Sequence, residues 1–481
     1  MLESNKSKRI KRVKQVLVSL FFILILVVFV YDFKLYITTK LISATVKNNK
    51  FENGTMKKTD VDISKNVWNL AHKGNYYENG DLRKFPYPYS SMLSICSDID
   101  DTTLEDFKIY HQFLNTKEET SHGKGLGLDV GDSMWLYMGE KYSKSQNGIH
   151  RPDEVMTYYK GINVNKENNA YEITNFIKGG WIDCIHTFGD FSTEDEKRTL
   201  FTRKLAINGW ETFKNIGFTP KVWINHGNKS NKQNFGAATS SSFMSYQEGD
   251  NPESRYYHTD ITLENGIKYV WNSVNSNIFG QEYPLFEISL RDGRKVWGFY
   301  RYTNEISNGK LDWTWIPGEI YRQLTESNLD GIVKNKQYSI VAQHFGVSAQ
   351  ELFTEKNIRA LRLLKQYEDD NKILVAKTTR LLDYADVHKY VIYNKFVENG
   401  ITYINIIGVN DPLFGKFIPK IDNLRGLTFY TDKSENTNIL LNGIVLSKDE
   451  IQRNSEDETG KESVSIKWYK PDYKDYSKCS K

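Results

Sequence analysis

The chain has 481 residues and carries 64 Lys and Arg against 60 Asp and Glu, a net charge of +4. Its hydrophobic share of 39% and aromatic share of 14% are too high for a disordered chain. Six of the positive charges lie before residue 15, so the remainder is near neutral, which argues against a nucleic-acid surface. Its three cysteines, Cys96, Cys184 and Cys479, are too few for a disulfide scaffold or a cysteine-rich zinc site.

The amino-terminal segment joins a basic tail (residues 1–14) to an uncharged apolar run at 16–30. At about 1.5 Å per residue, a helix over 15–37 is long enough to cross a hydrocarbon core of roughly 30 Å. A cleaved signal peptide has a similar pattern, but no small-x-small cleavage site follows the run, which favours an uncleaved signal anchor. The positive-inside tendency then predicts a single-pass cell-membrane protein, with its amino terminus in the cytoplasm and its folded domain outside.

Residues 38–66 are polar and lack periodicity, which indicates a stalk. From residue 67, short apolar runs alternate with helical patterns, and this alternation predicts a parallel, barrel-like α/β domain over 67–387. The strand-like runs are 91–100, 181–188, 221–227, 267–272 and 338–346, and the helical patterns are 104–115, 194–217 and 355–370.

The pattern changes towards the carboxyl terminus, where strand-like runs follow one another closely, separated by NG, ND and charged turns. They include 373–384, 390–397, 401–409 and 463–469. Closely spaced strands of this kind predict a small antiparallel β module over 388–481.

Polar clusters follow four of the apolar runs. The first is Ser97 to Thr102, where Asp98, Asp100 and Asp101 crowd together. Carboxylates this close raise one another's pKa unless a cation compensates, so a bound metal ion is one explanation. A helix cap is the alternative, because an Asp followed by TTLED resembles a capping box.

The other three clusters each contain a histidine: His186 with Asp190, His226 after the run at 221–225, and His344 after the run at 338–343. An imidazole and a carboxylate four residues apart can hold one divalent ion. A packed histidine, with Asp190 capping a helix that begins near Ser192, is an equally good interpretation of the second cluster. The carboxyl ends of parallel barrel strands share one face, so we expect all four clusters at one rim.

These motifs resemble those of metal-dependent polysaccharide deacetylases of the chitin-oligosaccharide deacetylase type, over about residues 88–385. Ile99-Asp100-Asp101-Thr102 is similar to the family's Asp-Asp motif, His186 to Asp190 to its His-Ser/Thr-x-x-His motif, with Asp in place of the last His, and Ile340 to His344 to its late Leu-x-Leu-x-His motif. The Arg-x-Pro-Tyr motif of the family is absent. The resemblance implies a distorted (β/α) barrel.

The resemblance also implies metal-assisted removal of N-acetyl groups from a cell-surface polysaccharide. Asp101, His186 and Asp190 would then bind a divalent ion, with zinc as the first candidate. Asp100 would act as the base, and His344 or His226 would protonate the departing amine. Tryptophans suit stacking on sugar rings, although core and surface packing is the better explanation of any single one; they include Trp135, Trp181, Trp223, Trp271, Trp297, Trp313 and Trp315.

Two other functions fit the same residues. A glycoside hydrolase would use two of the carboxylates as acid and base, from the set Asp98, Asp100, Asp129, Asp132 and Asp190. A non-catalytic, membrane-tethered carbohydrate-binding protein would use the terminal β module instead, and its four polar clusters would not converge.

Overall fold

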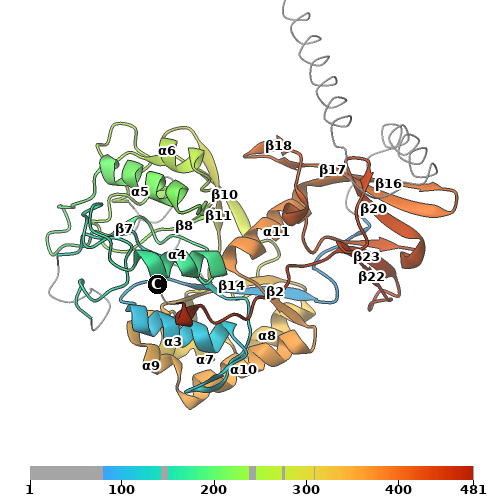
Figure 1. Ribbon diagram of the computed structural model, residues 1–481, viewed down its shortest axis with the longest axis horizontal. Helices are drawn as coiled ribbons and strands as arrows, with labels where there is room; N and C mark the ends of the chain where they lie inside the picture. Colours follow the sequence, from blue (N-terminus) through green and yellow to red (C-terminus); the bar gives the residue numbers. More distant parts are fainter. Residues whose placement is uncertain (1–79, 142–149, 238–244, 273–276, 308, 480–481) are drawn as a thin grey trace, which may run out of the picture. The chain divides into compact units, whose positions relative to one another are not determined.

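The computed structural model describes residues 80–141, 150–237, 245–272, 277–307 and 309–479 (Figure 1). All of them belong to one compact unit that spans Val67–Lys481. The predicted tail (1–14), membrane span (15–37) and stalk (38–66) lie outside the described residues.

A parallel sheet forms the centre of the unit. Its middle strand is β2 (Ser91–Ser97), which pairs with β14 (Tyr338–Gln343) on one side and with β15 (Ile373–Val375) and β5 (Gly131–Asp132) on the other. Every residue of β2 is buried, as its apolar and small side chains require of a strand that is covered on both faces.

A second sheet has the order β10-β11-β9-β8. Its strands β8, β9 and β11 are parallel, and β10 is antiparallel to β11. Their bounds are β8 Val222–Ile224, β9 Tyr269–Trp271, β10 Leu285–Ser289 and β11 Lys295–Phe299. Three small two-stranded sheets complete this part of the unit: β3 (Glu119–Thr120) with β4 (Gly123–Lys124), β6 (Tyr137–Met138) with β7 (Gly189–Asp190), and β12 (Asn304–Ser307) with β13 (Lys310–Trp313).

The predicted distorted (β/α) barrel is wrong. The described residues form several small sheets, and no continuous strand ladder closes them into a barrel. Among the described residues, isolated bridges link strands of the central and second sheets to neighbouring segments, at Asp132↔Ile182, Ile185↔Trp223, Gln281↔Tyr338 and Tyr302↔Val341. The run at 181–188, predicted as a strand, makes only isolated bridges, at Ile182 and Ile185, and its backbone bends at 186–188, where Thr187 has a φ of 60°.

Helices surround the sheets, and Figure 1 shows α3, α7, α8, α9 and α10 gathered on one side of β2. The helices are α3 (Leu104–Asn115), α4 (Ala170–Gly179), α5 (Arg203–Asn215), α6 (Thr259–Glu264), α7 (Ile320–Gln323), α8 (Glu326–Lys334), α9 (Ala349–Leu352), α10 (Glu355–Asp369) and α11 (Thr378–Tyr390). The helix α3 begins with a capping box, in which Thr103 and Asp106 each satisfy a backbone N–H of the other.

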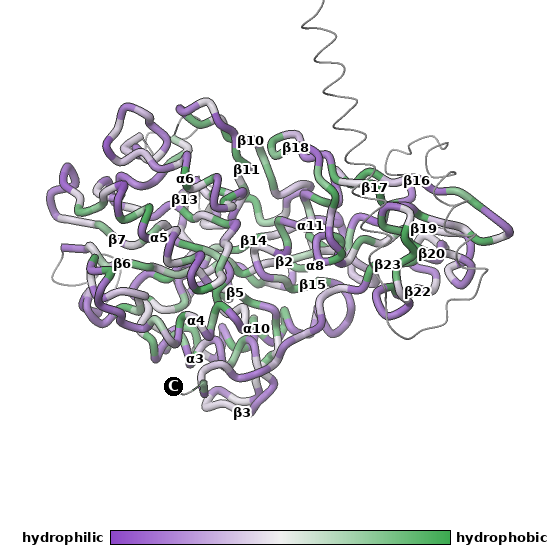
Figure 2. Tube along the Cα trace, turned by 45° about the horizontal axis from the view of Figure 1, so that its top comes forward, coloured by the Kyte–Doolittle hydropathy of each residue, from purple (hydrophilic) through white to green (hydrophobic). Residues whose placement is uncertain are grey.

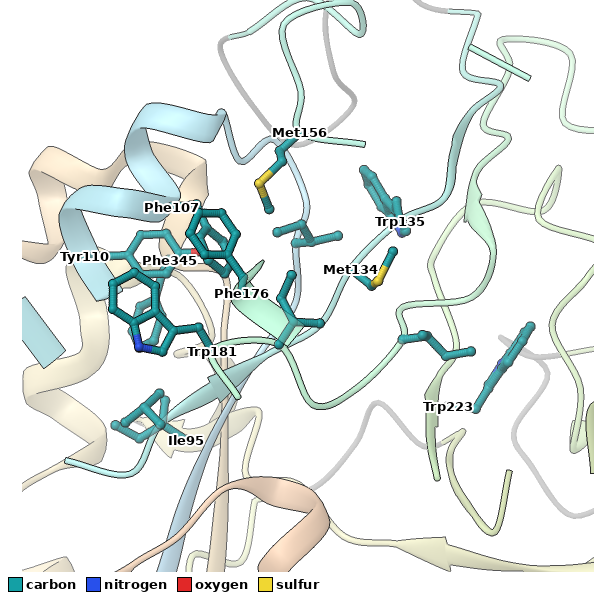
Figure 3. Packing of buried hydrophobic residues seen from close by; sticks show 14 of the residues in the cluster. Ile95, Phe107, Tyr110, Met134, Trp135, Met156, Phe176, Trp181, Trp223 and Phe345 are labelled. Atoms are coloured by element: carbon teal, nitrogen blue, oxygen red, sulfur yellow. The ribbon is translucent and has the colours of Figure 1, made fainter. Parts of the chain in front are cut away.

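Aromatic side chains fill the space between α3, α4 and the central sheet. Figure 3 shows Phe107, Tyr110, Phe176, Trp181 and Phe345 packed together near Ile95. The ring centroids of Phe107 and Phe176 are 4.6 Å apart, and those of Phe176 and Trp181 are 5.6 Å apart. This packing joins α3 and α4 to the central sheet.

The carboxyl-terminal part contains two further sheets. One has the order β16-β17-β20-β21 with β18 beside β17, and the other the order β1-β19-β23-β22. The strand bounds are β1 Leu82–Arg83, β16 Val391–Glu398, β17 Ile401–Asp411, β18 Gly415–Phe417, β19 Thr428–Thr431, β20 Thr437–Leu441, β21 Ile444–Val445, β22 Ile451–Asn454 and β23 Glu462–Ile466. Figure 2 shows apolar residues along strands such as β17 and polar residues along the outer loops.

The module expected at 388–481 differs from this arrangement in three ways. The pair β17–β20 is parallel, so the module is not purely antiparallel. The strand β1, from the start of the described chain, joins its second sheet through β19. The helix α11 runs across residues 387 and 388, so the predicted boundary lies within a helix.

The sequence analysis also predicted a single-pass membrane protein. In the part of the chain that the structure describes, no helix combines the length and the apolar composition needed to cross a bilayer. This finding contradicts the predicted location, and the predicted span at 15–37 lies outside the described residues.

Candidate metal centre

Buried polar side chains meet where several strands end. Asp98 and Asp100 follow β2, His226 lies two residues after β8, and His344 directly follows β14. His186 follows Ile185, whose single parallel bridge to Trp223 places it beside β8. Parallel strands direct their carboxyl ends to one edge, so residues far apart in the sequence become neighbours.

Asp100, His186 and His226 form the tightest group. Nε2 of His186 is 2.9 Å from Oδ2 of Asp100, and Nδ1 of His226 is 3.1 Å from Oδ1 of Asp100. The two imidazole nitrogens are 2.8 Å apart. All three side chains are at most 4% exposed. Three buried donor atoms that converge in this way could hold a metal ion.

Two observations test whether the group suits a divalent cation. Two imidazoles and one carboxylate are the donor set common to zinc and iron sites. Asp100 Oδ2 is buried and makes no hydrogen bond among the described residues, although Nε2 of His186 lies close to it. A buried carboxylate oxygen with free lone pairs is costly unless a cation compensates, so the group fits a metal ion.

Asp190 contacts His226 from outside the group formed by Asp100, His186 and His226. Its Oδ1 lies 3.3 Å from Nε2 of His226, the ring nitrogen that faces away from Asp100. The backbone N–H of Ser192 donates to the same oxygen at 2.8 Å, which fixes the carboxylate. A carboxylate in this position orients the imidazole and makes its other nitrogen a stronger ligand.

Trp135 supports both histidines. Its indole N–H donates to the backbone oxygen of His186 at 2.6 Å. Its ring stacks on the His186 ring at 5.7 Å and meets the His226 ring edge-on at 5.2 Å. Both imidazoles are therefore held in place by packing before any ligand binds.

Asp98, Asp100 and His344 form a second group of possible ligands. Nε2 of His344 is 3.5 Å from Oδ2 of Asp98 and 3.7 Å from Oδ2 of Asp100. The guanidinium of Arg301 donates two parallel hydrogen bonds to the carboxylate of Asp98, of 2.9 Å to Oδ1 and 2.8 Å to Oδ2. Because the guanidinium already neutralises Asp98, this carboxylate is a weaker metal ligand than Asp100.

Burial and nearby charges shift the pKa of each of Asp98, Asp100 and His226 in opposite directions. Burial raises the pKa of Asp100, but the charges of His226 and His186 outweigh burial and hold it well below its ordinary value. Burial also raises the pKa of Asp98, and the charges of Arg301 and His186 outweigh it. Burial lowers the pKa of His226, but Asp100 and Asp190 raise it well above its ordinary value. The carboxylates are therefore ionised, and their negative potential attracts a cation, whether a proton or a metal ion that displaces it.

His344 behaves differently, because burial lowers its pKa more than Asp100 and Asp98 raise it. It is therefore neutral near pH 7 and able to accept a proton. Its ring lies 4.3 Å from the ring of Trp315, and its side chain is 13% exposed, more than those of Asp98 and Asp100. His344 therefore faces the accessible side of the centre.

Comparison with known proteins adds no relative. No protein-family model, no curated protein and no solved structure matches the chain. The chemistry of the centre is therefore argued from its own residues.

The structure brings five predicted site residues together: Asp100, His186, His226, Asp190 and His344. It leaves out Asp101, which was expected to bind the metal. Asp101 has a φ of 53°, and its carboxylate turns to His150, which contacts it through Nδ1 at 3.1 Å and through its backbone N–H at 3.1 Å. Asp100 takes the position expected for Asp101, because the chain turns sharply between the two residues.

Two further carboxylates, considered as glycosidase residues, have other partners. Asp132 accepts a hydrogen bond of 2.6 Å from the Tyr110 hydroxyl. Asp129 pairs with Arg380 at 2.7 Å and Lys377 at 3.3 Å. Neither belongs to the two groups of possible ligands.

The sequence analysis missed the role of Arg301. This arginine is 1% exposed and lies two residues after β11. A basic residue directly after a buried strand, at the same edge as the acidic clusters, is the signal that could have identified it. The pattern of acidic and histidine residues alone gave no indication of a cationic partner.

Proposed function

We propose that this chain is a metal-dependent hydrolase that removes N-acetyl groups from a polysaccharide. The observation that carries the proposal is the arrangement of two adjacent carboxylates with different partners: Asp100 with two histidines, and Asp98 with Arg301 and His344. Asp100 can bind a cation together with the histidines, whereas Asp98 is already paired with Arg301 and can accept a proton. This division suits hydrolysis of an amide by an activated water.

Asp100, His186 and His226 would hold the ion, and Asp190 would keep His226 in its ligating orientation. Once bound, a divalent ion such as zinc lowers the pKa of a water molecule and polarises an acyl oxygen. The sequence-based roles of Asp100 as base and of Asp101 and Asp190 as ligands are replaced in this proposal.

Asp98 would accept the proton of the attacking water. Arg301 keeps this carboxylate ionised and in one orientation, since its planar guanidinium binds both oxygens. Arg301 is itself fixed, because its guanidinium lies 4.4 Å from the ring centroid of Trp271.

His344 would pass the proton to the departing amine. Its Nε2 is 3.5 Å from Asp98, close enough to receive a proton that Asp98 has collected after a small movement. A neutral imidazole accepts this proton and then acts as the acid for the leaving group. Asp98 and His344 thus form a short path from the attacking water to the amine.

Acetate release from an N-acetylhexosamine oligosaccharide, measured together with the metal content of the purified full chain, tests the proposal. The parent protein should hold about one equivalent of a divalent ion and release acetate, and His186→Ala should lose both. His122→Ala is the matched control, because His122 stacks on Phe353 and belongs to neither group of possible ligands. A parent protein that binds no divalent ion would refute the proposal.

The same assay separates the alternative glycoside hydrolase. Cleavage of glycosidic bonds produces new reducing ends without acetate, whereas deacetylation produces acetate without new reducing ends. New reducing ends in a chelated, metal-free sample would favour the glycosidase.

A further inference from the structure

A cavity lies away from the metal centre. It has a volume of about 260 Å³ and is bordered by the chain before β2, the end of α10, the strand β15 and residues 468–473. Tyr89 precedes β2, whereas Asp98 and Asp100 follow it. The seven residues of β2, at roughly 3.3 Å each, put Tyr89 on the cavity wall about 20 Å from the centre.

Aromatic rings form much of the wall of this cavity. Trp468, Tyr469 and Tyr473 come from the carboxyl-terminal segment, and Tyr89 comes from the chain before β2. All four are partly exposed rather than buried. Partly exposed rings around a hollow provide flat apolar faces with polar edges.

Each of two rings is backed on one face by a cation. The guanidinium of Arg380 lies 4.1 Å from the centroid of Tyr469, and Nζ of Lys117 lies 4.0 Å from the centroid of Tyr473. Gly127 permits the second contact, because a Cβ at this position would approach both Lys117 and Tyr473 to 3.0 Å. These cations favour one orientation of each ring.

The charged residues of the wall neutralise one another. Three cations line the cavity, as do three carboxylates: Lys117, Lys365 and Arg380 against Asp129, Glu368 and Asp369. Lys365 pairs with Glu368 at 3.0 Å and with Asp369 at 2.7 Å, and Arg380 pairs with Asp129 at 2.7 Å. A balanced set offers no net attraction to an anion or a cation, but it offers many hydrogen-bond donors and acceptors.

We propose that this cavity is an accessory binding site for a neutral saccharide. Sugar hydroxyls both donate and accept hydrogen bonds, which suits paired ammonium and carboxylate groups, and the C–H faces of a sugar ring pack on aromatic rings. The volume is below the roughly 300–1,000 Å³ of pockets that enclose drug-sized ligands, so it fits a short segment of a glycan. This inference does not depend on catalysis at the metal centre.

The test is isothermal titration calorimetry of the full chain with a neutral N-acetylhexosamine tetrasaccharide, in the presence of chelator and in a His186→Ala background. These conditions remove the metal ion, and the variants of the wall residues Tyr473 and Lys117 assign the remaining binding to this cavity. Tyr473→Ala and Lys117→Ala should each weaken this binding about tenfold, the equivalent of roughly 1.4 kcal/mol. Tyr300→Ala is the matched control, because Tyr300 is an exposed tyrosine that is not part of the cavity wall.

Equal binding by Tyr473→Ala, Lys117→Ala and the parent would overturn the inference, as would tighter binding of a uronate-containing tetrasaccharide than of the neutral one. Circular dichroism confirms that each variant is folded. Saccharide binding here without acetate release would leave this inference intact and refute only the proposed function. Acetate release without binding in the His186→Ala background would do the reverse.

Discussion

At the scale of single residues, Asp98 and Asp100 are only two positions apart and yet have different partners. Arg301 binds both oxygens of Asp98, whereas two histidines approach Asp100. We expect Asp100→Asn to lose the metal ion, because an amide oxygen is a weaker ligand than a carboxylate. Asp98→Asn should keep the ion but lose about 100- to 10,000-fold in rate, the usual cost of removing a general base. Metal analysis and acetate release on the same samples measure both effects.

Asp101→Asn is the control for this pair. Its carboxylate contacts His150, so the variant should retain metal close to the parent level. Loss of metal from Asp101→Asn together with retention in Asp100→Asn would restore the roles implied by the family resemblance and contradict the geometry described above.

Asp190 acts on the centre through His226. We expect Asp190→Ala to weaken metal binding about 10- to 100-fold without abolishing it, which is typical of a carboxylate that orients a ligating histidine. Competition with a chromogenic chelator measures this affinity. Asp195→Ala, at an exposed position nearby in the sequence, should leave the affinity unchanged. Complete loss of metal from Asp190→Ala would instead identify Asp190 as a direct ligand.

At the scale of elements, the hairpin β12–β13 follows the strand that leads to Arg301 and presents Trp313 at its end. Trp313 is 42% exposed, and Trp315, two residues later, contacts His344. Arg322 anchors the hairpin through Glu305 and Asp312. The hairpin therefore holds an exposed indole on the segment that leads to the metal centre.

We expect Trp313→Ala to raise KM for an oligosaccharide about 3- to 10-fold and to leave kcat nearly unchanged. An aromatic contact is worth roughly 0.5–1.5 kcal/mol, and this one lies outside the reacting groups. Steady-state acetate release with a monosaccharide and a tetrasaccharide checks it, since only the longer substrate should respond. Phe414→Ala, at an equally exposed aromatic on the β17–β18 turn, should change neither constant.

The elements also show how far the sequence could be interpreted. The helical pattern at 104–115 coincides with α3, because its amphipathic spacing and the Thr103–Asp106 capping box agree. The run at 373–384, in contrast, was interpreted as a strand, and only Ile373–Val375 is one. The rest begins α11, where Leu381, Leu382 and Ala385 are buried at helical spacing. A short apolar run has no period of its own, so tertiary packing decided between strand and helix.

The site was predictable to a similar extent. Residues that follow apolar runs, such as His186 and His344, could be located because parallel strands share an edge. The division of roles among Asp98, Asp100 and Asp101 depends on one backbone turn at Asp101 and on Arg301, about 200 residues later. Neither leaves a local signature in the sequence.

At the scale of the whole molecule, acid should destabilise the fold through buried neutral histidines. His258 is fully buried and bonds Thr262 through Nδ1 and the backbone oxygen of Gln233 through Nε2. Burial lowers its pKa to about 4, whereas in an unfolded chain the value is about 6.5. Between these two pKa values, His258 is protonated in the unfolded chain and neutral in the folded chain. The free energy of unfolding therefore falls as the pH drops from 6.5 to 4.

This shift in the pKa of His258 corresponds to roughly 3 kcal/mol of stability. Asp386 has the opposite effect, because burial raises its pKa to about 6, so its protonation favours the folded state as the pH falls.

A single variant separates the two effects. His258→Asn should be less stable than the parent at pH 7.5, and the difference in free energy of unfolding should shrink by about 3 kcal/mol at pH 4, since the variant has no proton to gain. Urea denaturation at both pH values measures this change. If His258→Asn does not fold, His388→Asn provides the same test, because burial also lowers the pKa of His388 to about 4. A difference between parent and variant that stays constant from pH 7.5 to 4 would show that these histidines do not govern the acid limit of the fold.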